Sequence, residues 1–188
     1  MPSDRYSHVV GFDDGSFTRQ HRGDVVVVGA VFSGQRLEGM LAGRVRRDGA
    51  NAAARLATLI AASQFAAQLR LVLLQGVALA GFNVVDVEAL HRETGLGVLV
   101  VARRRPDLAG IHRALGKVRG GERKWRLIER LGEMEPAAGL YVQRRGIALA
   151  DAERVLTRLA LHSRLPEPLR VAHLAAGALA RGRSRGRV

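Results

Sequence analysis

Four aspartates near the ends of predicted strands are the side chains of this sequence best suited to catalysis. Asp13 and Asp14 follow an apolar stretch, Asp48 ends another strand, and Asp86 comes after the loop that follows a third. Carboxylates that meet at neighbouring strand ends can hold Mg²⁺ or Mn²⁺, which neutralises a phosphate and polarises an attacking water. A metal site for phosphate chemistry is therefore one interpretation of these residues.

Each aspartate also has an ordinary structural interpretation. Adjacent residues of a strand point to opposite faces, so only one of Asp13 and Asp14 faces a shared site directly. Asp48 and Asp86 are well placed to cap helices, and Asp14 could close an Asx turn. We favour a functional role for Asp13.

The segment 76–83 has the residues that a base or phosphate pocket needs. Gly76 and Gly81 allow close backbone approach, Phe82 is aromatic, and Asn83 is polar. A packed hairpin or turn is the alternative. The segment matches neither G-x-G-x-x-G nor a P-loop, so it gives little support to a nucleotide cofactor.

Two arginine clusters follow predicted strands: Arg103, Arg104 and Arg105, then Arg144 and Arg145. If these strand ends converge, both clusters flank the acids and contact phosphates. A solvated run of charge is the alternative. We expect His173, on the apolar face of the last helix, to be a buried, hydrogen-bonded histidine and not a ligand.

The composition favours a folded, basic protein. The 188 residues carry 30 Lys and Arg against 17 Asp and Glu, a formal net charge of +13, and 47% are hydrophobic. All basic residues except Lys117 and Lys124 are arginine, which suits nucleic acid, although a GC-rich genome produces the same bias. We expect one domain over residues 1–180 and a basic tail over 181–188.

Two absences narrow the function classes. The chain has no cysteine, which excludes disulfides, thiol catalysis and thiolate metal sites. No apolar stretch reaches the ~18–20 residues of a membrane span, and no signal peptide is visible. We therefore expect a cytoplasmic protein without a membrane partner, and the sequence makes no prediction of its oligomeric state.

The pattern of apolar residues predicts an α/β fold. Three early strands form an antiparallel meander that feeds parallel strands, as in ribonuclease H-like folds, with a mixed sheet flanked by helices. The β-branched run at 25–32 should lie centrally. The predicted strands are 8–12, 25–32, 37–47, 71–74, 97–102 and 140–143, and the predicted helices are 50–69, 86–93, 106–116, 122–131, 149–161 and 168–180.

Three stretches together carry a family resemblance. They are Gly-Phe-Asp-Asp-Gly at 11–15, Gly-Phe-Asn-Val-Val-Asp at 81–86, and Leu-Pro-Glu-Pro-Leu-Arg-Val-Ala-His at 165–173. These stretches resemble domain of unknown function family 99, found mainly in archaea and linked with endonuclease dU. That family is similar to endonuclease V, a ribonuclease H-like, metal-dependent enzyme that nicks DNA near deaminated bases.

The resemblance implies roles for several residues. Asp13 matches the metal-binding aspartate of the first strand, and Asp48 matches the acidic residue that ends the third. Mg²⁺ or Mn²⁺ would be held by Asp13 and Asp48 with Asp14 or Asp86. One departure is Gln75, which stands where endonuclease V has a metal-binding aspartate and offers only a neutral carbonyl. Another is the segment 144–147, which lies where endonuclease V carries a catalytic histidine.

The function implied is a metal-dependent endonuclease acting on DNA that contains deaminated bases, with deoxyuridine as the first candidate. The alternative is a catalytically inactive nucleic-acid-binding protein that keeps the fold, with Gln75 marking the loss of the metal site. A nuclease acting on RNA differs only in its substrate.

Overall fold

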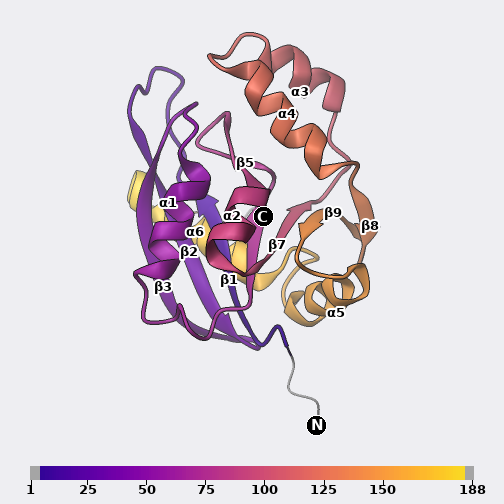
Figure 1. The fold of residues 1–188 in the computed structure, drawn as a ribbon. Coiled ribbons are helices and arrows are strands. Elements are labelled where there is room, and N and C mark those ends of the chain that lie inside the picture. The colour runs from indigo at the N-terminus through magenta and orange to yellow at the C-terminus, as the bar shows by residue number, and fades with distance from the viewer. Residues whose placement is uncertain (1–4, 185–188) are drawn as a thin grey trace.

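The fold is built on a mixed β-sheet in the computed structural model, which describes residues 5–184. Seven strands lie in the order β3-β2-β1-β4-β7-β9-β8, and β5 and β6 form a small separate hairpin (Figure 1). β1, β4 and β7 are parallel, whereas β2, β3, β8 and β9 join by antiparallel pairing. The strands are β1 (His8–Asp14), β2 (Asp24–Ser33), β3 (Arg36–Arg46), β4 (Leu71–Gln75), β5 (Ala78–Leu79), β6 (Asn83–Val84), β7 (Gly97–Ala102), β8 (Glu135–Ala137) and β9 (Leu140–Arg145).

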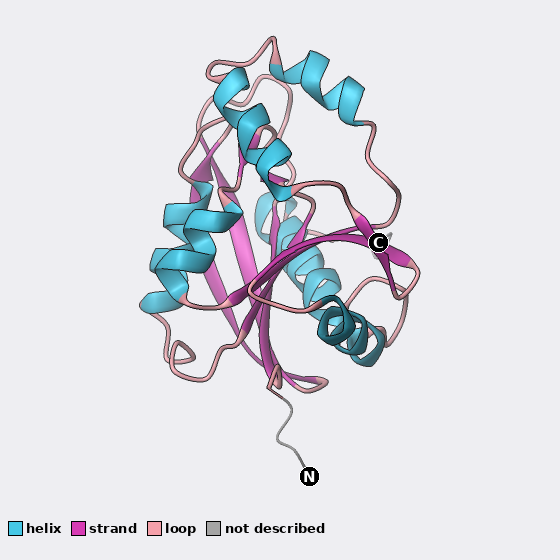
Figure 2. Ribbon diagram, turned by 45° about the vertical axis from the view of Figure 1, so that its right-hand side comes forward, coloured by secondary structure: helices cyan, strands magenta, loops and turns pink. Residues whose placement is uncertain are grey.

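Helices cover both faces of this sheet (Figure 2). Because side chains alternate along a strand, β1 contributes Phe12 to one apolar core with α1 and α2, and Val9 to another with α5 and α6. The predicted α/β sheet flanked by helices is therefore confirmed. The helices are α1 (Ala52–Ala61), α2 (Val87–Thr94), α3 (Leu108–Leu115), α4 (Gly121–Leu131), α5 (Leu149–Leu159) and α6 (Glu167–Arg181).

The position predicted for the β-branched run at 25–32 is wrong. β2 is the second strand from one side of the sheet, and β4 is the central strand. β2 is nevertheless largely buried, because it contributes to the core under α1 and contacts α6 on the opposite face. A continuous apolar run indicates that a strand is buried on both faces, and helices bury β2 in this way. The run does not indicate where in the sheet the strand lies.

Several predicted boundaries shift. α1 ends at Ala61, and the chain continues through turns to Leu69. β8 lies between the predicted helix 122–131 and the predicted strand 140–143, where no element was predicted, and Arg144 and Arg145 lie within β9. Arg181 ends α6, and of the predicted basic tail, residues 185–188 lie outside the described residues. Among the helices of residues 5–184, none combines the length and hydrophobicity that crossing a membrane requires.

Candidate active site

The candidate site lies where β1 and β4 end. Asp13 and Asp14 are the last residues of β1, and Gln75 is the last residue of β4. The parallel register pairs Phe12 with Leu74 and so brings Asp13 beside Gln75. We call this group of Asp13, Asp14 and Gln75 the acid end of the sheet.

Asp13 is paired with a histidine. Its carboxylate is buried, with 7% of the residue exposed, and its Oδ2 lies 2.8 Å from His173 Nδ1. Its Oδ1 accepts a hydrogen bond from the Asp14 N–H at 2.9 Å. Burial raises the pKa of Asp13, and the hydrogen bond with His173 opposes this rise. Asp13 is thus a desolvated carboxyl held in a fixed orientation.

The close packing of α6 on β1 brings His173 to this position. A side chain at Gly11 would come within 2.7 Å of the Pro168 backbone, so the absence of a Cβ permits the approach. His173 lies on the next turns of the same helix. The prediction that His173 is merely a buried histidine is wrong: 37% of its side chain is exposed, and it faces a candidate catalytic acid. The available signal was its place at the end of the third matched stretch.

The β5–β6 hairpin lies between Asp14 and Asp48. The Asp14 carboxylate accepts a hydrogen bond from the backbone of Ala80, and Asp48 Oδ1 accepts one from the Phe82 N–H at 2.8 Å. The Asp48 N–H in turn donates to the Ala80 carbonyl at 3.0 Å. Asp48 has a φ of 51°, an uncommon left-handed conformation for a residue other than glycine. The hairpin therefore fixes both acids.

Two cations also hold Asp48. Lys124 of α4 is buried and donates from Nζ to the Asp48 carbonyl at 2.5 Å. Burial lowers the pKa of Lys124, and the charge of Asp48 opposes this change. Arg47 Nε lies 3.2 Å from Asp48 Oδ2. Asp48 follows β3, as predicted, but these contacts could not be foreseen because Lys124 is 76 residues away.

Two other residues that were predicted to belong to the site instead stabilise the local fold. Asp86 caps α2, because its Oδ1 accepts a hydrogen bond from the Ala89 N–H at 2.9 Å. Asn83 is fully buried and bonds to Ala52 N, Arg46 O and Asn51 Oδ1. The expectation that Asn83 contacts substrate is corrected, since its amide holds the turn between β3 and α1 together.

The remainder of the segment 76–83 is more accessible. Gly76 and Gly81 both have positive φ angles, of 76° and 82°, and Gly81 is exposed. Phe82 is half-buried against the apolar side of α3 and α4. The segment therefore contains the hairpin of the structural alternative, and its role as a pocket wall stays a prediction.

The two arginine clusters lie at different places. Arg103, Arg104 and Arg105 are exposed just beyond the end of β7 that lies beside Gln75. By contrast, β9 is antiparallel to β7, so Arg144 and Arg145 pair with Leu99 and Val98 toward the opposite end of the sheet.

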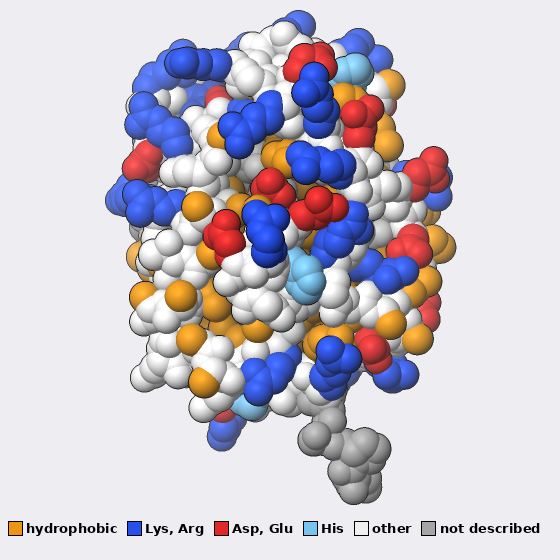
Figure 3. Space-filling view, viewed as in Figure 1, with side chains coloured by type: hydrophobic (Ala, Val, Ile, Leu, Met, Phe, Trp, Pro, Cys, Tyr) orange, Lys and Arg blue, Asp and Glu red, His pale blue; other side chains and the backbone are white. Residues whose placement is uncertain are grey.

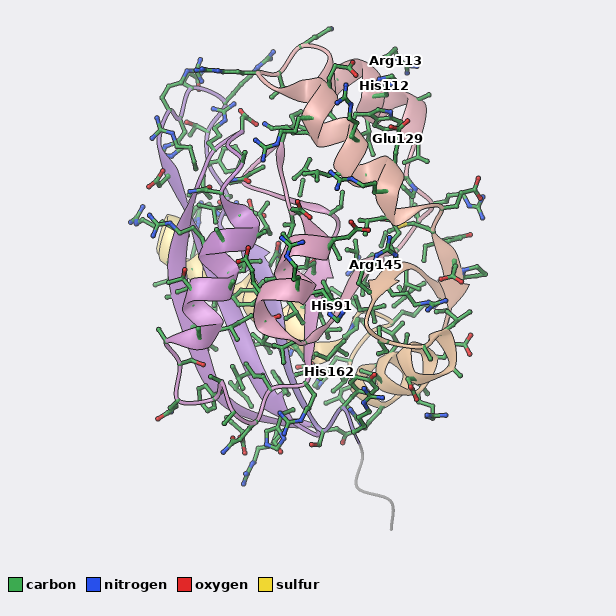
Figure 4. All side chains as sticks on the ribbon, in the orientation of Figure 1. His91, His112, Arg113, Glu129, Arg145 and His162 are labelled. Carbon is green, nitrogen blue, oxygen red and sulfur yellow. The ribbon has the colours of Figure 1, made fainter. Side chains whose placement is uncertain are left out.

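The expectation that Arg144 and Arg145 flank the acids is therefore corrected. Figure 4 shows Arg145 beside β9, well below α3 and α4. Both guanidinium groups are already paired, Arg144 with Glu135 at 2.9 Å and Arg145 with Glu88 at 3.0 Å. These arginines fasten β9 to its neighbours.

The donors at the acid end fit a hard cation. Within residues 5–184, no three Asp, Glu or His side chains form a metal-binding cluster, and Asp13, Asp48 and Asp86 do not gather. However, Gln75 Oε1 is buried beside Asp13 and has no hydrogen-bond partner among the described residues. A buried oxygen without a partner is unfavourable unless an ion or water satisfies it, and amide oxygens are accepted ligands of Mg²⁺.

The Asp14 carboxyl makes a contribution to the free energy of unfolding that depends on pH. Burial, and then the charge of Asp13, raise the pKa of Asp14 from 3.8 to about 6. The folded state therefore binds this proton more tightly than the unfolded state. The resulting stability is present below about pH 4 and is lost as the pH rises to about 6.

Replacing Asp14 by Asn is therefore expected to raise the free energy of unfolding at pH 7 by about 1–2 kcal/mol without added metal. Urea denaturation of both proteins should show a difference that grows between about pH 4 and pH 6 and then levels off. Asp151→Asn is the control for the loss of one carboxyl group, since Asp151 pairs with Arg154 on α5. A difference that is constant with pH would contradict the assignment.

Known sequences similar to this chain match it over nearly its whole length. The model of the endonuclease dU family matches residues 5–180. A UPF0215 protein of Deinococcus radiodurans is 60% identical over 183 residues, covering 97% of this chain and 93% of the relative.

Solved structures of other proteins share the fold of this chain. A protein of unknown function from Archaeoglobus fulgidus has 32% identity and a TM-score of 0.87, covering 93% of this chain and 99% of the other. Ciona intestinalis endonuclease V, solved with a 24mer DNA containing an inosine followed by a ribo-adenosine, has 15% identity and a TM-score of 0.56. That match covers 88% of this chain and 82% of the other. The predicted ribonuclease H-like fold is confirmed.

Proposed function

Since the chain belongs to the endonuclease dU family, we propose that it is a divalent-metal-dependent endonuclease that cleaves DNA containing a deaminated base. Deoxyuridine is the first candidate substrate. The observation that carries this proposal is the buried Asp13, which is hydrogen-bonded to the partly exposed His173 and lies beside the unpartnered oxygen of Gln75. Desolvated acids of this kind with specific charge partners are typical of functional sites.

Asp13 and Gln75 would hold Mg²⁺ or Mn²⁺. Asp14 lies on the opposite face of the same strand end, and Asp48 lies across the β5–β6 hairpin. When bound there, the ion supplies Lewis-acid chemistry, which polarises the phosphate and neutralises its charge. Asp13 occupies His173 Nδ1. His173 Nε2 is then the ring nitrogen available to exchange a proton with water or substrate.

The neighbouring loops would receive the DNA. Gly76, Gly81 and Phe82 form the accessible part of the β5–β6 hairpin and would line the pocket for an extruded base. Extruding a base costs a few kcal/mol and least when the base is mispaired, which favours deaminated bases over normal ones. Arg103, Arg104 and Arg105 would contact phosphates.

A second candidate is a nucleic-acid-binding protein without catalysis. The observation that favours it is Gln75, because a neutral amide binds a hard cation more weakly than a carboxylate does. The two candidates differ in metal binding and turnover, and not in fold.

Cleavage assays separate these candidates. Labelled duplexes containing uracil, hypoxanthine or neither, together with matched RNA, should be incubated with Mn²⁺ or with EDTA. We expect cleavage of the uracil duplex with Mn²⁺ and none with EDTA. If no substrate is cleaved, calorimetry shows no metal binding, and DNA binding weakens steeply with salt, the protein is a binding protein.

A further inference from the structure

The helical hairpin of α3 and α4 carries much of the positive charge of the chain. Residues 108–131 contain seven Lys and Arg against two Asp and Glu. Figure 1 shows this hairpin beyond the end of the sheet toward which β1 runs. In Figure 3, Lys and Arg side chains gather over the upper part of the same face. A positive element therefore stands next to the acid end.

The hairpin is fixed to the rest of the molecule. Leu115 of α3 and Ile128 of α4 pack with Val84 of β6 in a small apolar core. His112 stacks on Trp125 with ring centroids 4.3 Å apart, which joins the two helices. The Lys124 hydrogen bond to the Asp48 carbonyl connects α4 to the turn after β3. The position of its charges relative to Asp48 is thus set by packing.

A cavity of about 280 Å³ separates α4 from this turn. Asp48 and Asp86 line one side of it, Arg119, Arg123 and Lys124 line the other, and apolar side chains complete the wall. In the described part of the chain, the side chains of Arg119 and Arg123 have no hydrogen bond or ion pair. Their guanidinium groups are available to bind a phosphate bidentately.

The two arginines at the end of β9 differ from Arg119 and Arg123. Arg144 is paired with Glu135, and Arg145 with Glu88, so their charges are neutralised internally. On the hairpin, Arg113, Lys117 and Arg126 are exposed; Figure 4 shows Arg113 at the outer end. An excess of cations over acids on one rigid element favours an external polyanion.

We propose that the α3–α4 hairpin is the arm that grips the DNA backbone, with Arg119 and Arg123 binding one phosphate of the strand in the cavity beside Asp48. Arg113, Lys117 and Arg126 contact neighbouring phosphates. This inference rests on the proposed nuclease function and adds to it the element that positions the strand over the site. Readout of the base is left to the β5–β6 hairpin, because phosphate contacts carry no sequence information.

The test measures the salt dependence of DNA binding for the double variant Arg119→Gln/Arg123→Gln. Fluorescence anisotropy with a uracil-containing duplex in EDTA avoids cleavage. The loss of this one phosphate contact should lower the slope of log affinity against log salt by about 0.9 and the affinity by about tenfold at low salt. Arg119→Lys/Arg123→Lys should restore most of the slope.

The control removes the same charge elsewhere. Arg92→Gln/Arg154→Gln changes exposed arginines near the far end of α2 and on α5 and should alter the slope by much less than 1. Equal slopes for both double variants would overturn the arm, because only net charge would then matter. Cleavage by the unmodified protein is scored separately, so failure of the nuclease proposal is distinguishable from failure of the arm.

Discussion

Replacing Asp13 by Asn is expected to lower the rate of DNA cleavage by about a thousandfold or more. Asn has nearly the same shape and can still accept the hydrogen bond from His173, but it lacks the charge that would hold a divalent cation. The structure gives the change no reason to unfold the protein, because a buried carboxyl with a raised pKa is itself unfavourable when ionised at pH 7.

Three measurements check this prediction. Single-turnover cleavage of the uracil duplex gives the rate, calorimetry gives Mn²⁺ binding, and thermal unfolding shows that the fold persists. Asp151→Asn is the matched control, since Asp151 pairs with Arg154 on α5 away from the acid end. A folded Asp13→Asn protein that cleaves as fast as the unmodified one would remove Asp13 from the site, and with it the metal-dependent mechanism proposed.

Two changes at Gln75 are expected to have the second largest effects. Gln75→Leu should weaken metal binding, and Gln75→Asp should strengthen it. Gln75→Leu removes the buried oxygen that lacks a partner, so metal affinity and cleavage should fall by about 10- to 100-fold. The same change should raise the free energy of unfolding by about 1–3 kcal/mol, because it removes an unsatisfied buried group. Gln75→Asp supplies a carboxylate and should tighten Mn²⁺ binding by about tenfold or more.

The combination of effects is the informative result. Removing a polar group that supports the fold lowers both stability and activity. Removing a group that serves only function lowers activity and raises stability. Calorimetric Mn²⁺ titration and urea denaturation of the three proteins test this directly. If Gln75→Leu binds metal and cleaves like the unmodified protein, the oxygen has no part in the site. If only Gln75→Asp binds metal, the natural protein is the inactive binding protein.

Local patterns in the sequence predicted most of the helices and strands. The strands at β1, β4 and β7 were identified because their apolar runs are short and end at acids, Gln75 or arginines. α2 was predicted with its cap and its end, since Asp86 bonds to the first turn and Gly95 adopts the left-handed conformation that stops it. β8 was missed because three residues including a proline give no periodic signal.

The site was only partly predictable for the same reason. The four aspartates near strand ends were visible, as were the opposite faces of Asp13 and Asp14 and the helix cap at Asp86, but the contacts of Asp13 with His173 and of Asp48 with Lys124 were not. Asn83 is a polar residue of the kind that contacts substrates, but its buried side chain makes its hydrogen bonds within the fold. Its role depends on Ala52, Arg46 and Asn51, none of which its local sequence reveals.

The sequence by itself determined most of the elements, the excess of arginine and the position of acids at strand ends, because these follow from composition and from the spacing of a few residues. Only the tertiary structure decided that His173 reaches Asp13 across 160 residues, that Arg144 and Arg145 lie toward the wrong end of the sheet, and that Lys124 bonds to Asp48. These contacts depend on strand direction and on how closely α6 and α4 pack. Both are set by the burial of apolar side chains far from the site, and no local pattern records that burial.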